Sequence, residues 1–108
     1  MSTFDKRQEG FEKKFALDEE QKFKATARRH RTLGAWVAEQ TGLSGAEADA
    51  YAKSVVAADF EEAGDDDVFR KVRGDLDAKG KQSISDADIR MKMDALLAEA
   101  AAEIKAGT

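Results

Sequence analysis

The amino-acid sequence predicts an all-α protein, a four-helix bundle preceded by a flexible N-terminal segment. Proline is absent, alanine is abundant and 37% of the 108 residues are charged, a composition that favours helix and carries almost no strand signal. Apolar residues recur at helical spacing in four stretches, which glycines and short polar residues separate. The chain has room for one modest core, so we expect residues 18–108 to form the bundle and residues 1–17 the segment.

The first helix of the bundle is expected from about Asp18 to Gln40. Its apolar pattern ends before Thr41 and Gly42, and glycine there is a typical C-terminal stop. The residues near its buried stripe are Phe23, Ala27, Leu33, Trp36 and Val37.

The second helix is expected to open at Ser44, with Glu47 completing a capping box, and to end at Gly64. Its buried stripe comprises Tyr51, Val55, Ala58 and Phe60.

The third helix is expected to begin within Asp65–Asp67, because carboxylates cap free amides and suit the positive end of the helix dipole. Gly80 ends it, and its inward residues are Val68, Phe69, Val72 and Leu76.

The fourth helix is expected from Ser85, with Asp88 completing a second capping box, to about Ala106. Its inward residues are Ile89, Met93, Leu96, Leu97, Ala100 and Ile104. Short connections between four amphipathic helices predict a compact bundle whose neighbours are antiparallel or cross at an angle.

The N-terminal part of the chain has the pattern of a partner-binding helix. Phe4, Phe11, Phe15 and Phe23 are separated by 7, 4 and 8 residues, which places them on one helix face. Residues 1–33 hold nine Lys or Arg against six Asp or Glu, whereas the remainder holds nine against sixteen. This pattern predicts docking into an acidic groove of a larger partner. The alternative is that Phe15 and Phe23 pack against the bundle beneath a solvated charged face.

The residue types present disfavour catalysis and metal binding. Cysteine is absent, His30 is the only histidine, and no serine sits in a pattern typical of an activated nucleophile. Asp75–Asp86 resembles a calcium-binding loop, but Lys79 occupies a ligand position and Asp86 stands where glutamate is the rule. We interpret this stretch as a helix stop followed by a cap. We therefore predict no enzyme, no metal and no required cofactor.

Three arginines, Arg28, Arg29 and Arg31, cluster on the first helix and could hold phosphate groups. Trp36 and Tyr51 could then offer a stacking surface. The alternative is that both aromatic residues belong to the core and the arginines form a solvated face.

The sequence as a whole resembles the alphaproteobacterial zeta-subunit family, inhibitors of the F-type ATP synthase. The strings that carry the resemblance are FEKKFA at 11–16, DEE at 18–20, FKA at 23–25, ARR at 27–29, LGAW at 33–36, GL at 42–43, YAK at 51–53, ADFEEAG at 58–64, DVFRK at 67–71 and MDAL at 93–96. The resemblance implies a four-helix bundle whose flexible N-terminal segment enters a catalytic interface of the F1 head and blocks ATP hydrolysis. It also implies binding of ADP or ATP.

Carried over to this chain, the resemblance implies an inhibitory segment from Ser2 to about Glu19. Its residues matching the family pattern are Phe4, Asp5, Arg7, Phe11, Lys14 and Phe15, and Lys13 adds a further cation expected to meet acidic groups of F1. The implied partners are the alpha/beta catalytic interface of F1, the central stalk and an adenine nucleotide. We predict that Arg28, Arg29 and Arg31 hold the phosphates of that nucleotide. His30 and Gln8 depart from the family pattern, which has asparagine and an acidic residue there.

We further expect a cytoplasmic protein, monomeric when free, that reaches the inner membrane only through F1 and binds no nucleic acid. This expectation rests on the pattern of the sequence, which shows neither the apolar stretch typical of a signal peptide nor an apolar run long enough to span a membrane. Two other functions fit the same pattern: a free-standing adenine-nucleotide sensor whose N-terminus folds back on its own body, and a helical interaction module.

Overall fold

The computed structural model describes residues 16–58 and 66–107, and the regular structure in both ranges is entirely helical. The helices are α2 (Glu19–Gln40), α3 (Gly45–Ala58), α4 (Asp66–Ala78) and α5 (Asp86–Lys105). The all-α prediction and the four helices of the bundle are therefore confirmed. The N-terminal segment, with Phe4, Phe11 and Phe15, lies outside the described residues, as do Phe60 and the expected helix stop at Gly64.

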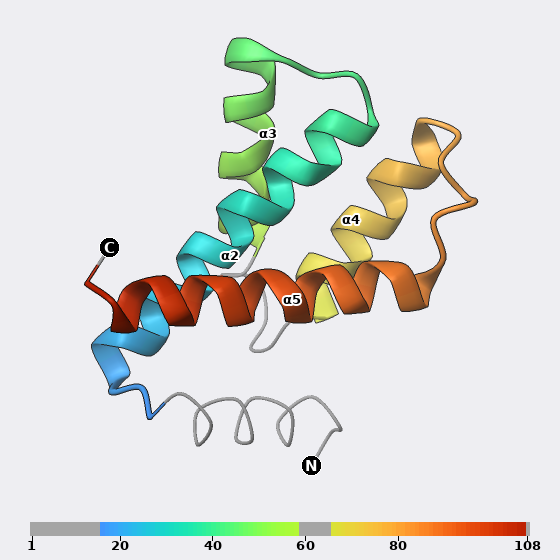
Figure 1. Cartoon of the computed structure of the whole chain (residues 1–108). Helices are drawn as coiled ribbons and strands as arrows, with labels where there is room; N and C mark the ends of the chain where they lie inside the picture. Colours follow the sequence, from blue (N-terminus) through green and yellow to red (C-terminus); the bar gives the residue numbers. More distant parts are fainter. Residues whose placement is uncertain (1–15, 59–65, 108) are drawn as a thin grey trace.

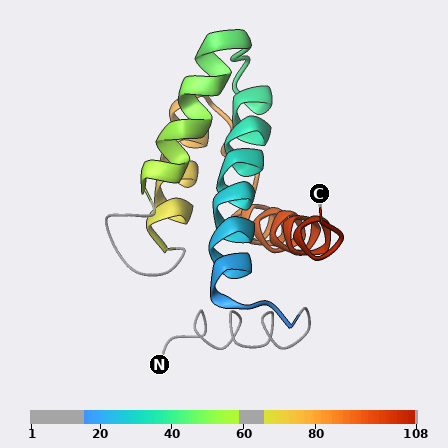
Figure 2. The same ribbon diagram turned by 90° about the vertical axis from the view of Figure 1, so that its left-hand side faces the viewer.

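Helix α5 lies across the other helices rather than alongside them. α2 and α3 form an antiparallel pair, α4 packs against both of them, and α5 crosses α2 near the start of α2 (Figure 1). In the view along α5, α2 and α3 stand side by side and α4 lies behind α3 (Figure 2). The bundle therefore combines antiparallel neighbours with one crossing helix, as the short connections predict.

Two apolar clusters hold the helices together. The main core contains Leu33, Val37, Val55, Val68, Val72, Leu76, Ile89, Met93 and Leu96, with Trp36, Tyr51, Phe69 and Ile84 packed against it. A smaller core contains Leu17, Ala25, Ala100 and Ala101, with Leu97 and Ile104 beside it. The smaller core fixes the beginning of α2 on the C-terminal half of α5. Leu17, assigned to the N-terminal segment by the sequence, therefore packs on the bundle.

Helix ends are satisfied largely as the sequence predicts. At α5 the Asp88 amide donates to the Ser85 hydroxyl at 3.0 Å, and the Ser85 amide donates to the Asp88 carboxylate at 3.2 Å. The same reciprocal pair forms between Asp18 and Gln21 at the start of α2. Such caps typically contribute about 1 kcal/mol each.

Glycines end α2 and α4 in the same way. Gly42 and Gly80 have left-handed φ values of 78° and 75°. After α4, the amide of Lys81 donates to the Leu76 carbonyl at 2.9 Å and that of Gly80 donates to the Asp77 carbonyl at 3.0 Å. These two hydrogen bonds satisfy carbonyl groups that a helix end otherwise leaves free. The turn that forms them requires a residue that tolerates positive φ.

The capping box expected at the start of α3 is not formed in the described structure. Gly45, the first residue of α3, has a φ of 56°, and the Ala48 amide donates to the backbone carbonyl of Ser44 at 3.4 Å. The left-handed turn at Gly45 redirects the chain between Ser44 and Glu47. Their side chains therefore do not make the reciprocal bonds that a regular first turn allows.

Phe23 is the clear failure of the predicted stripe, because its side chain is 69% exposed. Gly34 of α2 faces Ala52 of α3, and α3 ends at Ala58, six residues further on. In an antiparallel pair, this end corresponds to a position about six residues before Gly34, so α3 does not extend as far as Phe23. The spacing of Phe23 is correct for the stripe, but α3 as described, up to Ala58, does not cover it.

Candidate functional site

The site predicted from sequence has two parts, and the structure describes one of them. The proposed partner-binding residues from Phe4 to Phe15 lie outside the described residues. The three arginines lie in α2, where they occupy two different environments. Only part of the arginine cluster reaches the surface.

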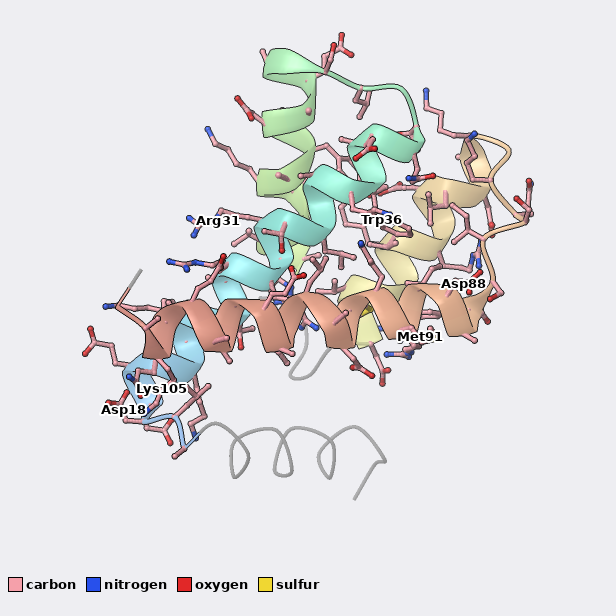
Figure 3. The ribbon with its side chains drawn as sticks, in the orientation of Figure 1. Asp18, Arg31, Trp36, Asp88, Met91 and Lys105 are labelled. Atoms are coloured by element: carbon pink, nitrogen blue, oxygen red, sulfur yellow. The ribbon has the colours of Figure 1, made fainter. Side chains whose placement is uncertain are left out.

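Arg28 and Arg31 lie at the surface of α2, one turn apart. The Arg31 side chain is exposed and points away from α5 (Figure 3). The guanidinium of Arg28 lies 3.2 Å from the Glu103 carboxylate, and this ion pair joins α2 to α5. Residues three apart on a helix are neighbours, so these two arginines can act on one ligand.

Arg29 is buried instead, with 1% of its surface exposed. Its Nε donates to Nδ1 of His30 at 3.2 Å, and His30 is equally buried. Arg29 falls four residues after Ala25 and four before Leu33, both fully buried. That i, i+4 spacing was the sequence signal that Arg29 belongs to the inner face.

Trp36 and Tyr51 pack against the main core and are half-buried, as the alternative reading of the aromatic residues predicts. The Tyr51 hydroxyl donates to the Asp75 carboxylate at 2.6 Å, and Lys71 Nζ lies 3.1 Å from the same carboxylate. Burial raises the pKa of Tyr51, and the hydrogen bond and negative charge of Asp75 raise it further. Tyr51 therefore remains a protonated donor that ties α3 to α4.

The calcium-like stretch has a structural role. Asp75 and Asp77 lie within α4, so the backbone there is helical rather than looped. Arg73 pairs with Asp77 at 2.7 Å and with Asp86 at 3.0 Å, and it also donates to the Ile84 carbonyl at 2.7 Å. These acidic side chains hold the α4–α5 connection against α4. In the two described ranges, no three His, Cys, Asp or Glu residues are grouped to hold a metal ion.

Gly34 is a residue whose role the sequence did not reveal. A Cβ atom built on it would lie 2.6 Å from the Ala52 Cα atom, closer than such atoms approach in real structures. Glycine is therefore required for the close approach of α2 and α3, since side chains set the distance between helices. A glycine inside a predicted helix was the available signal.

Fold and site together define a small all-helical domain. No described helix is long and apolar enough to span a membrane. The chain matches the sequence model of the family described as ATPase inhibitor subunit zeta over residues 1–103. The chain belongs to this family of inhibitor subunits, whose members are not enzymes.

One solved structure gives independent support for the fold. A protein known from a solution NMR structure is 52% identical and superposes with a TM-score of 0.68, over 80% of this chain and 96% of that chain. No curated protein matches the chain. The family match includes residues 1–15, so it extends to the segment that carries the phenylalanine pattern.

Proposed function

We propose that the chain inhibits ATP hydrolysis by the F1 part of the ATP synthase, by inserting its N-terminal segment into an alpha/beta catalytic interface. The observation that carries this proposal is the family match, which covers the basic, phenylalanine-spaced residues 1–15 as well as the bundle. The matched family is one of ATPase inhibitors. The segment has the amphipathic pattern of a helix that binds in a groove.

The side chains of the segment divide the work of binding. Phe4, Phe11 and Phe15 share one helix face and supply apolar surface for burial on the catalytic subunits. The cations that speed encounter with acidic groups are Arg7, Lys13 and Lys14, and Asp5 completes the set of contact residues.

The bundle anchors the segment at a fixed point. Asp18 caps α2 and Leu17 is buried in the smaller core, so the rigid body begins two residues after Phe15. Holding one catalytic interface in a single conformation is enough to stop a rotary cycle, because every full turn requires each interface to change conformation. Contact of the bundle with the central stalk would resist rotation further. On this proposal the protein acts as a monomer at the cytoplasmic face of the inner membrane.

Removal of the segment is the direct test. Purified alphaproteobacterial F1 is titrated with the full chain and with a chain that starts at Leu17, and ATP hydrolysis is measured. We expect saturable inhibition by the full chain and none by the shortened one. Both described cores lie within residues 17–104, so the shortened chain retains them, and its helical circular dichroism is the control. Equal inhibition by both chains would assign the activity to the bundle and refute the proposal.

We also propose that adenine nucleotide binds at the arginines of α2. The exposure of Arg31 and the position of Arg28 one turn away support phosphate binding by these two side chains, whereas Arg29 is buried and would act from the inner face. Titration of the ¹⁵N-labelled chain with ADP is expected to shift the backbone amide signals of residues 28–31. Replacement of Arg31 by Gln, a substitution at an exposed position, should weaken this response. Unchanged signals at all three arginines under saturating ADP would eliminate the site.

A further inference from the structure

Among the Phe, Tyr and Trp side chains of the two described ranges, Phe23 is the one that neither core uses. The other three, Trp36, Tyr51 and Phe69, pack against the main core. Phe23 is 69% exposed on α2 and belongs to neither cluster. An exposed ring by itself indicates no ligand, because single apolar side chains are common on protein surfaces. The residues around it on α2 therefore decide what the ring can bind.

The row of α2 residues that begins at Phe23 leads to Arg31. Phe23, Ala27 and Arg31 follow one another at steps of four residues, which places them in neighbouring positions on one side of the helix. Arg31 is exposed like Phe23, and the small side chain of Ala27 leaves room between them. The eight residues from Phe23 to Arg31 rise about 12 Å at 1.5 Å per residue. An extended nucleoside diphosphate is long enough to lie between the two side chains.

Further positive charge borders this row. Lys24 and Arg28 lie beside it, and Arg28 is one turn from Arg31. Lys24 Nζ lies 3.0 Å from the Glu20 carboxylate, and the guanidinium of Arg28 lies 3.2 Å from that of Glu103. Both glutamate side chains are more than half exposed, and exposed ion pairs contribute little to stability. A diphosphate, which carries more negative charge than one carboxylate, can therefore compete for these cations.

We propose that Phe23 holds the base of the nucleotide by stacking, while Arg28 and Arg31 hold its phosphates. This inference rests on the nucleotide site proposed above and adds a contact for the base, which the arginines do not provide. Every base has a flat aromatic face, so stacking on a phenylalanine ring requires no hydrogen-bonding side chain at the edge of the base. Trp36 and Tyr51, the stacking residues expected from the sequence, pack against the core instead.

Comparison of ADP with inorganic pyrophosphate isolates the contact to the base. Pyrophosphate has the two phosphates of ADP but no base, so on this proposal it contacts the arginines alone. The ¹⁵N-labelled full chain is titrated with each ligand, and the dissociation constant is obtained from the backbone amide shifts of α2. We expect ADP to bind more tightly than pyrophosphate. The adenine proton signals should also move upfield on binding, because a stacked ring shields them.

Three substitutions separate the base contact from the phosphate contact. Phe23→Ala should weaken ADP binding by at least about fivefold, the smallest loss expected for one stacked base, and leave pyrophosphate binding unchanged. Phe23→Tyr keeps an aromatic ring and should retain both the ADP affinity and the upfield shift. Arg31→Gln should weaken both ligands. Phe23 and Arg31 are exposed, so thermal unfolding of all three variants is expected to match that of the unmodified chain.

Each outcome distinguishes this inference from the proposals on which it depends. If Phe23→Ala binds ADP as tightly as the unmodified chain while Arg31→Gln does not, the base contact is refuted and the arginine site stands. Equal weakening of ADP and pyrophosphate by Phe23→Ala also refutes the base contact, because the ring then acts on the phosphates or on the fold. Failure of the unmodified chain to bind ADP removes the arginine site and this inference together. Inhibition of F1 is measured separately, by titration of F1 with the full and the shortened chain.

Discussion

Replacing Phe11 and Phe15 together by alanine is expected to raise the concentration needed for half-inhibition of F1 by at least about 100-fold. Each phenylalanine contributes roughly 1.5–3 kcal/mol when its side chain is fully buried. Two such losses give about 3–6 kcal/mol, and each 1.4 kcal/mol corresponds to about tenfold in affinity. The measurement is ATP hydrolysis by purified F1 titrated with the variant.

Phe23→Ala provides the matched control. It is the same substitution, but the Phe23 side chain lies 69% exposed on α2, outside both cores. We expect it to change neither inhibition nor the thermal unfolding of the bundle. If Phe23→Ala weakens inhibition as strongly as the double substitution, the binding surface is not confined to the segment. If the double substitution inhibits like the unmodified chain, apolar burial by Phe11 and Phe15 does not drive binding.

Local signals in the sequence predicted most of the fold. The stop at Gly42, the stop at Gly80 and the capping box of Ser85 with Asp88 were all correct, because the residues that satisfy a helix end lie within a few positions of it. The core of α4 was also correct, since Val68, Val72 and Leu76 follow one another at steps of four. These features depend on neighbours along the chain.

The capping box expected at Ser44 failed for a local reason, the left-handed backbone of Gly45, whereas the other errors arose where the outcome depends on another element. Phe23 has the right spacing for the core, but its burial depends on how far α3 extends along α2. Burial of Arg29 follows from its spacing with Ala25 and Leu33, a signal that its charge obscured. A charged side chain is rarely buried unless paired, so composition alone placed it at the surface. Arg29 and Arg31 point to different sides of α2, because residues two apart on a helix lie on nearly opposite faces. Their closeness in the sequence conceals this difference.

Recognition of the partner came from a different kind of signal. The order and spacing of matching strings over the whole chain identified the family, which the match over residues 1–103 confirms. Neither charge nor periodicity alone could name F1. The contact residues from Phe4 to Phe15 and the arginine site stay predictions. The F1 titration tests the contact residues, and the ADP titration tests the arginine site.

Gly34→Ala is expected to destabilise the bundle, although alanine is the better helix former. The added Cβ would lie 2.6 Å from Ala52 Cα, so the backbones of α2 and α3 must move apart. Overpacking of this kind costs about 1–3 kcal/mol, which outweighs a gain of up to about 1 kcal/mol in helix propensity. We expect a net loss of about 1–2 kcal/mol. Thermal unfolding followed by circular dichroism should show a melting temperature lower by roughly 4–15 °C.

Gly74→Ala makes this test decisive, because the same substitution should have the opposite sign. Gly74 also lies inside a helix, in α4, but a Cβ atom there would meet nothing within 4 Å. Only the propensity gain remains, and we expect stabilisation by about 0.5–1 kcal/mol. Stabilisation by both substitutions would show that α2 and α3 are not in close contact at Gly34. Opposite signs would establish that Gly34 is required by packing between helices, since helix propensity is common to both positions.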